Sequence, residues 1–241
     1  MQVRSTNKSD YTHGMERDPD IQREWLRLFD RFVLRLIELK PESVLDVGCG
    51  RGVLVNQLSQ AGILATGIDP KAPGHDPQII QGDVERLPFG DDDFEWVTLR
   101  HVPHHLPDLS AALRECVRVT RKGLLIAEPW FDLTDPLQQI SERWDRWWKR
   151  QHERAGDVHK ACIPVSGIVA ALPVGDFDIE AEHYRHVAHI TPEAIEKLSK
   201  PLLDELPPDN PDRGEYTQIM QQINERGFTY NGTVIVKVTR G

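Results

Sequence analysis

The sequence lacks any apolar run that approaches the roughly 20 residues needed to cross a lipid bilayer. Its first ten residues, Met1 to Asp10, are polar and contain no apolar stretch of the kind that secretion signals carry. We therefore expect a cytoplasmic protein with no membrane span.

Cysteine is scarce, with 3 residues in a chain of 241, and no two of them form a C-x-x-C pair. Such cysteines are expected to be reduced thiols. No group of histidines and cysteines has the spacing of a zinc site, so the sequence predicts no metal. Basic residues number 29 against 38 acidic ones, which gives a net charge of −9. Because nucleic-acid binding depends on basic patches that neutralise phosphates, this balance argues against a nucleic-acid partner.

Strands and helices are expected to alternate through the first half of the chain. A helix that starts at Asp18-Pro19-Asp20 and stops before Pro41 comes first. The expected strands are 43–47, 64–68, 77–81, 94–99 and 123–128, with helices at 52–61 and 108–119. The segment 70–77 is too rich in proline and glycine for a long helix. This alternation predicts an α/β fold with a doubly wound, Rossmann-like sheet that is mostly parallel.

The sequence of the second half of the chain predicts a helical insertion and two further strands. The N-cap sequence Thr134-Asp135-Pro136 opens a helix that is expected to end at Gly156. Helices are also expected at 165–172, 192–206 and 212–226, and strands at 177–190 and 231–239. Residues 1–241 are expected to form one domain, with a core of about 40–130 and 165–241 and a helical insert of about 130–160.

The most informative segment is Val44-Leu45-Asp46-Val47-Gly48-Cys49-Gly50-Arg51-Gly52, an apolar strand that ends in a glycine-rich turn. Glycine lets the backbone turn sharply and approach a ligand closely. Asp46 is expected at the carboxyl end of the strand, where open α/β sheets bind ligands. The next strand ends at Asp69, 21 residues after Gly48. An acid there can accept hydrogen bonds from both hydroxyls of a ribose, so the pattern predicts a nucleoside-bearing cofactor.

The glycine spacing differs from that of dinucleotide-binding proteins, whose fingerprint is G-x-G-x-x-G, because position 53 is a valine. The segment instead resembles the first motif of class I S-adenosylmethionine-dependent methyltransferases, in the small-molecule, ubiquinone/menaquinone-biosynthesis-like branch known as type 11. Five further segments resemble this family in order and spacing over about residues 40–130. They are Gly67-Ile68-Asp69, Gln81 to Phe89, Asp93 to Val97, His104-His105-Leu106-Pro107-Asp108, and Arg118 to Pro129.

The resemblance implies a single methyltransferase domain with a seven-stranded sheet whose final strand is antiparallel. It implies S-adenosyl-L-methionine as cofactor, S-adenosyl-L-homocysteine as product, and a small-molecule acceptor with an O, N, C or S nucleophile. Asp69 would hold the ribose hydroxyls, and Asp83 would accept from the adenine amino group. The residues assigned to cofactor binding are Asp46, Val47, Gly48, Cys49, Gly50, Gly52, Asp69, Pro70, Asp83, Val84, Arg100 and His101.

Methyl transfer from a sulfonium depends on alignment of the nucleophile, the methyl carbon and the sulfur, so no catalytic acid is demanded. A base is needed only where the acceptor loses a proton during the attack. The candidates at strand ends are His101, His104, His105 and Glu128. For His104 and His105, a role in bracing the loop is an equal alternative.

Four tryptophans in and before the expected insert are candidate substrate-binding residues: Trp130, Trp144, Trp147 and Trp148. Their rings could wall an apolar or aromatic pocket or stack on a cation. The alternative is that they pack the insert onto the domain or form the surface of a homodimer. Tyr11 and the N-terminal helix are expected to close over the cofactor, as in similar enzymes.

Other functions stay open beside this one. A nicotinamide-dependent oxidoreductase predicts NAD binding and no acid in the loop after the third strand. A non-catalytic S-adenosylmethionine-binding module predicts affinity without turnover. A methyltransferase that acts on protein or RNA is a further alternative, which the acidic balance disfavours.

Overall fold

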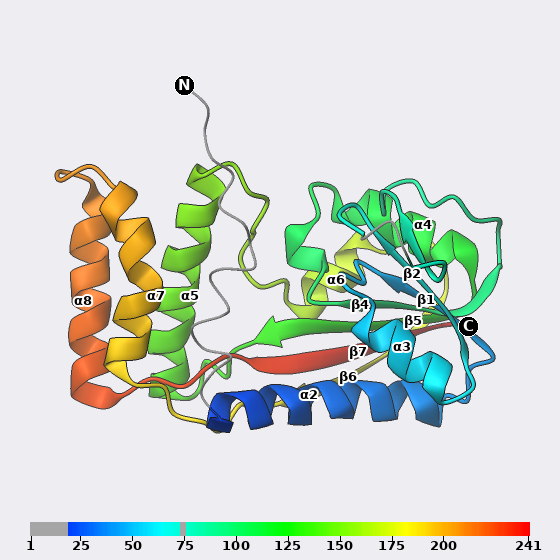
Figure 1. Cartoon of the computed structure of the whole chain (residues 1–241), viewed down its shortest axis with the longest axis horizontal. Helices are drawn as coiled ribbons and strands as arrows, with labels where there is room; N and C mark the ends of the chain where they lie inside the picture. The colour runs from blue at the N-terminus through cyan, green and yellow to red at the C-terminus, as the bar shows by residue number, and fades with distance from the viewer. Residues whose placement is uncertain (1–18, 73–75) are drawn as a thin grey trace. The chain divides into compact units, whose positions relative to one another are not determined.

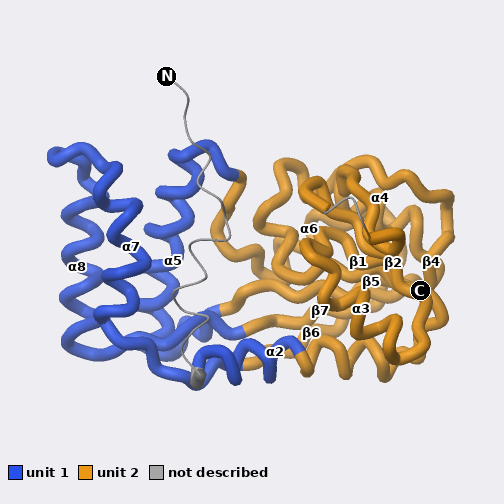
Figure 2. Tube along the Cα trace, in the orientation of Figure 1, with its two compact units in different colours: residues 1–29, 131–157, 185–232 blue, residues 30–130, 158–184, 233–241 orange. Residues whose placement is uncertain are grey.

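A computed structural model describes residues 19–72 and 76–241 of the chain (Figure 1). Tyr11 lies outside the described residues. The trace divides into two compact units (Figure 2). The first, here called the sheet unit, comprises residues 30–130, 158–184 and 233–241. The second, here called the helical unit, comprises the described residues up to 29 together with 131–157 and 185–232. The single domain expected over 1–241 stays a prediction beside this division.

The described part of the sheet unit contains a seven-stranded sheet in the order β3-β2-β1-β4-β5-β7-β6. The strands are β1 (Ser43–Val47), β2 (Leu64–Asp69), β3 (Ile79–Gln81), β4 (Phe94–Arg100), β5 (Thr120–Trp130), β6 (Phe177–Tyr184) and β7 (Gly232–Arg240). The first five run parallel. Strand β7 is antiparallel to both of its neighbours. The predicted Rossmann-like sheet with an antiparallel final strand is confirmed.

The strand order places a binding edge at the carboxyl end of β1. Strand β1 lies between β2 and β4, so the chain leaves the first strand toward one side of the sheet and later fills the other side. Open α/β sheets bind ligands at such a point, outside the carboxyl ends of the strands. We call the carboxyl ends of β1, β2, β3 and β4 the strand-end edge.

Helices cover both faces of the sheet. Helix α3 (Val53–Gln60) lies on one face, and α4 (Leu109–Val119) and α6 (Val165–Ala171) lie on the other (Figure 1). Helix α4 starts at Asp108, whose side chain accepts a hydrogen bond from the backbone N–H of Ala111 at 2.9 Å. Between β2 and β3, the described residues contain no helix, as the proline-rich segment predicts.

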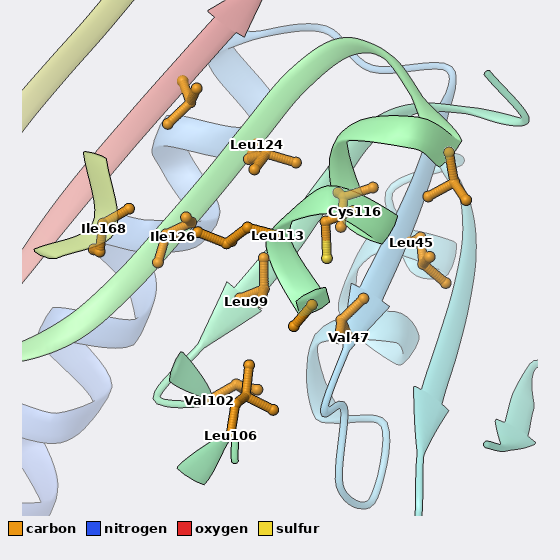
Figure 3. Close-up of a cluster of buried hydrophobic side chains, with 14 of the residues drawn as sticks. Leu45, Val47, Leu99, Val102, Leu106, Leu113, Cys116, Leu124, Ile126 and Ile168 are labelled. Atoms are coloured by element: carbon orange, nitrogen blue, oxygen red, sulfur yellow. The ribbon is translucent and has the colours of Figure 1, made fainter. Parts of the chain in front are cut away.

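The core of the sheet unit lies between the sheet and α4. Leu45, Val47 and Leu99 have no exposed surface, and they come from adjacent strands. Figure 3 shows Leu113 and Cys116 of α4 beside them. Strands that are covered on both faces are buried along nearly their whole length, as β1 and β4 are.

The helical unit has a core of its own. It contains α5 (Pro136–Arg154), α7 (Pro192–Glu205) and α8 (Pro211–Arg226), and the chain division falls within α2 (Pro19–Glu38). Helix α5 packs on α7 and α8. Trp144, Trp147 and Phe228 lie at the centre of this core. No helix in the described part of the chain is long and apolar enough to span a membrane.

One element boundary differs clearly from prediction. Strand β6 was expected to reach residue 190, but it ends at Tyr184, so that expectation is wrong. The ladder stops there because its partner β7 begins at Gly232, and Tyr184 already pairs with Thr233. Beyond it, only an isolated bridge joins His189 to Thr229.

Candidate cofactor and active site

The turn after β1 is built from three glycines in the left-handed region, Gly48, Gly50 and Gly52, with φ of 68°, 57° and 77°. A Cβ on Gly48 would lie 2.4 Å from Cγ2 of Val102, and one on Gly52 would lie 2.2 Å from Cδ1 of Ile79. A Cβ on Gly50 would meet no atom within 4 Å. An added Cβ at Gly48 or Gly52 would thus displace a neighbouring side chain, whereas Gly50 faces open space where a ligand can approach the backbone.

Asp46 is a buried carboxyl group at the end of β1, only 4% exposed. Its Oδ1 accepts a hydrogen bond from the hydroxyl of Thr98 on β4 at 2.9 Å. Burial raises the pKa of Asp46 to about 6, against the opposing effects of the Thr98 hydrogen bond and the charge of Arg100. A carboxylate kept where burial disfavours its charge is typical of a functional site. Val47, the next residue, has no exposed surface and belongs to the core.

Asp69 ties the end of β2 to the glycine turn. Its Oδ2 accepts from the backbone N–H of Gly50 at 3.0 Å, and its Oδ1 accepts from that of Lys71 at 2.7 Å. An ionised carboxylate has about four acceptor positions, so these two hydrogen bonds leave capacity for the hydroxyls of a ribose. The side chain is half-buried.

Cys49 packs within this turn and has no sign of reactivity. A Cβ on Gly67 of β2 would lie 2.6 Å from its Sγ, so the thiol fills the space beside that strand. Burial, aided by the charges of Asp46 and Asp69, raises the pKa of Cys49 to about 12. The thiol is therefore protonated at neutral pH and is no nucleophile.

The loop after β3 lies next along the edge. Asp83 is exposed, and its Oδ1 accepts from the backbone N–H of Glu85 at 2.9 Å. Val84 packs against the core of the sheet unit. The carbonyl of Pro70 accepts from the Gln81 side chain at 3.1 Å, which joins the ends of β2 and β3.

Arg100 is the last residue of β4 and His101 follows it, and both are half-buried. Burial lowers the pKa of the Arg100 guanidinium, and the carboxylate of Asp46 opposes that shift. His101 has a φ of 55°, in the region that residues other than glycine rarely adopt. Its backbone N–H donates to the carbonyl of Ala127 at 2.7 Å, which holds this conformation. Strained residues of this kind cluster at functional sites.

His104 and Glu128 form a buried pair beyond this edge, with 4% and 0% exposure. Nδ1 of His104 lies 2.9 Å and 3.0 Å from the two carboxylate oxygens of Glu128. His105 is half-buried, and its Nδ1 donates to the carbonyl of Val158 at 3.0 Å. His159 lies with them. No sequence motif groups it with His104 and His105, because it follows α5 and lies far from them along the chain.

The four candidate tryptophans divide between the two units. Trp144 and Trp147 lie in the core of the helical unit, where their Nε1–H groups donate to Ser199 Oγ at 3.0 Å and to the Asp212 carbonyl at 2.9 Å. Trp148 is half-buried, with its ring 6.0 Å from that of Trp144. Trp130 belongs to the sheet unit, and its ring lies 4.6 Å from that of His183. Substrate binding by these residues stays a prediction, and Trp147, with no exposed surface, contributes to packing.

The fold and the strand-end edge together define a class of protein. A sheet of order β3-β2-β1-β4-β5-β7-β6 with antiparallel β7, a glycine turn after β1 and an acid after β2 is the arrangement of class I methyltransferases.

Comparison with known proteins agrees with this class. Residues 45–127 match the family model described as a methyltransferase domain. A demethylmenaquinone methyltransferase of Mycobacterium marinum is 39% identical over 88 residues, which is 34% of this chain and 38% of that protein. The chain spans less than half the length of the curated relatives it matches.

Two solved structures share the fold. The YcgJ protein of Bacillus subtilis has a TM-score of 0.59 at 17% identity, over 88% of this chain and 98% of that one. A protein described as a SAM-dependent methyltransferase of Archaeoglobus fulgidus has a TM-score of 0.52 at 18% identity, over 97% of this chain and 100% of that one. Residues 45–127 are thus those of a type 11 methyltransferase domain, and the fold of the chain is that of solved methyltransferase structures.

Proposed function

We propose that this protein binds S-adenosyl-L-methionine at the strand-end edge and transfers its methyl group to a small-molecule acceptor. The observation that carries the proposal is the open space at Gly50, whose N–H is held by the carboxylate of Asp69. A nucleoside placed there meets bare backbone on one side and an acceptor for its ribose hydroxyls on the other.

The residues present fit this cofactor. Gly50 is the one glycine of the turn where an added Cβ would occupy open space rather than neighbouring atoms, so the turn leaves room for a ligand there. Asp69 can hold the ribose hydroxyls, and Asp83 and the Val84 backbone can hold the adenine. Arg100 and His101 are the candidates to flank the methionine end.

When bound, the cofactor supplies a methyl group already activated on a sulfonium sulfur. The residues of the edge then have to fix its position and exclude water, and positioning of this kind can lower a barrier by roughly 7–11 kcal/mol. Asp46 contributes a negative charge in a site of low dielectric, where it acts more strongly on a nearby cation than it would in water. His101 is our candidate to accept a proton where the acceptor must lose one.

A small molecule is the favoured class of acceptor for two reasons. Curated relatives that match part of the chain are named demethylmenaquinone methyltransferases, and that name specifies a quinone. The chain also carries a net charge of −9, which opposes binding to nucleic acid. The methylated atom, O, N, C or S, is left to experiment.

Calorimetric titration with S-adenosylmethionine, S-adenosylhomocysteine and NAD tests the proposal. We expect micromolar binding of both adenosyl ligands and no measurable binding of NAD. Binding of NAD alone would establish the oxidoreductase alternative and overturn the proposal. Transfer of a labelled methyl group to a panel of hydroxylated aromatic acceptors then separates an enzyme from a module that binds the cofactor without turnover.

A further inference from the structure

We propose that His104, His105 and His159 form a binding site for one divalent transition-metal ion, with zinc as the favoured ion. The site lies within the sheet unit. The proposal does not rest on methyl transfer, since the three side chains define it by themselves.

The three imidazoles converge. The nitrogen atoms that they offer as ligands all lie within 4.8 Å of one another. Tetrahedral zinc with Zn–N bonds of about 2.0–2.1 Å needs nitrogens about 3.3 Å apart. Binding of zinc would therefore require the ligand nitrogens to move closer together. The ring centroids of His104 and His159 are 5.4 Å apart, and those of His105 and His159 are 4.5 Å apart.

The tautomers of two of the rings suit coordination. The carbonyl of Val158 can only accept, so Nδ1 of His105 carries the proton and Nε2 of the neutral ring carries the lone pair. The carboxylate of Glu128 likewise fixes Nδ1 of His104 as the donor. A histidine that ligates metal almost always donates its other N–H to a carboxylate or a backbone carbonyl. Both of these supports are present, and Glu128 is fully buried.

The local chain keeps the three ligands in place. The backbone N–H of Lys160 donates to the carbonyl of His104 at 2.8 Å. This hydrogen bond joins the segment after α5 to the short 3-10 helix Pro103–His105. The side chain of Lys160 donates to the carbonyl of Pro107 at 2.8 Å. A metal bound here would cross-link two segments that are far apart in sequence.

Zinc is favoured because imidazole suits zinc, copper, iron and nickel, while magnesium and calcium prefer oxygen ligands. Three protein ligands leave one tetrahedral position for a water molecule or for an oxygen of a bound molecule. Coordination gives His104 and His105 a different task from that of a base, and it leaves His101 as the candidate base.

Titration of metal-free, untagged protein with Zn²⁺ against a chromophoric chelator tests the proposal. We expect one ion per chain with a Kd of about 1 µM or tighter. His159→Gln and His105→Gln should each weaken binding roughly a hundredfold, and Glu128→Gln should weaken it about 10- to 100-fold. The matched control is His183→Gln, because His183 is an exposed histidine of the same unit. Its affinity should equal that of the unmodified protein.

Absence of stoichiometric Zn²⁺ binding overturns the proposal, and so does unchanged affinity in both histidine variants. Circular dichroism checks that each variant folds. Should one of them fail to fold, the Co²⁺ absorption spectrum of the unmodified protein decides. A tetrahedral nitrogen-ligand spectrum supports the site, and the spectrum of hydrated Co²⁺ contradicts it. None of these measurements uses S-adenosylmethionine, so failure here leaves the proposed function standing.

Discussion

The strand-end edge of the sheet unit and the core of the helical unit differ in how their unusual residues affect the stability of the fold. At the edge, a carboxyl group is buried where its charge is disfavoured, and His101 adopts a left-handed conformation. In the helical unit, the large polar-tipped rings of Trp144 and Trp147 are buried with their N–H groups hydrogen-bonded. The first region holds features that cost folding energy, and the second holds features that stabilise the fold.

This difference separates residues that bind from residues that pack, although both kinds are buried. Asp46 and Trp147 are each almost inaccessible to solvent. Removing the charge of Asp46 should help folding and harm ligand binding, because the site keeps that charge at a cost. Removing the ring of Trp147 should harm folding and leave ligand binding unchanged. Four substitutions test this contrast, from the largest expected effect to the smallest.

Trp147→Ala should cause the largest loss of stability. The ring has no exposed surface, and its truncation leaves a cavity in the helical core, which costs about 3–5 kcal/mol of unfolding free energy. Urea unfolding followed by circular dichroism measures that loss. The affinity for S-adenosylhomocysteine, measured by calorimetry where the variant is folded, should be unchanged. Leu133→Ala is the control, because Leu133 is 53% exposed and its truncation should cost little. A large loss of affinity with unaltered stability would contradict the assignment of Trp147 to packing.

Asp46→Asn should stabilise the protein above pH 6. Burial raises the pKa of Asp46 from 3.8 to about 6, so the folded protein binds this proton more tightly than the unfolded chain does. Stability from this group therefore falls as the pH rises from about 4 to about 6 and is constant above that range. The shift corresponds to about 3 kcal/mol, which the asparagine variant should recover in large part at pH 7.5.

Unfolding free energies at pH 4.5 and pH 7.5 measure this effect. The difference between the two pH values should be smaller in Asp46→Asn than in the unmodified protein. Thr98→Val removes a hydrogen bond that favours the ionised carboxylate, so it should enlarge that difference. An equal pH dependence in all three proteins would refute the account of Asp46. The asparagine variant should also bind S-adenosylhomocysteine more weakly.

Asp69→Ala should weaken the binding of S-adenosylhomocysteine by roughly 30-fold, about 2 kcal/mol, because hydrogen bonds to a charged group contribute about 1.5–3 kcal/mol. Calorimetric titration measures the change. Asp76→Ala is the matched control, since Asp76 also accepts from a backbone N–H in the same region, that of Gln78 at 2.9 Å. Equal affinities in both variants would remove Asp69 from the cofactor site.

Gly50→Ala and Gly62→Ala form the finest test. Both glycines have positive φ, 57° and 81°, and a Cβ on either meets no atom within 4 Å. Each substitution should cost about 1–2 kcal/mol of stability from the left-handed backbone alone. Only Gly50→Ala should also weaken S-adenosylhomocysteine binding, by about tenfold or more, because its methyl group enters the space proposed for the ligand. Equal affinities would show that the open space at Gly50 has no part in binding.

Much of the sheet unit could be predicted from local sequence. The glycine run, the acid at the end of β2 and the apolar strands each follow from a few adjacent residues, since turn chemistry and burial on both faces leave local signals. The Asp108 cap and the breaker-rich segment before β3 are of the same kind.

The rest depends on contacts between distant segments. The end of β6 is set by where β7 begins, which no residue near Tyr184 reveals. His159 joins His104 and His105 only because the chain returns to the sheet unit after α5. The tryptophans of α5 have the spacing of one helix face, and that pattern does not tell a pocket from a core. Their burial in the helical unit comes from α7 and α8, which follow much later in the chain.

Hydrogen–deuterium exchange with and without S-adenosylhomocysteine tests the central claim most directly, because it reads both regions in one experiment. The account predicts slower exchange at residues 46–52, 69–72 and 83–84 when the ligand is added, in the segments that form the strand-end edge. Unchanged exchange in those segments, with protection confined to α5, α7 and α8, would contradict it.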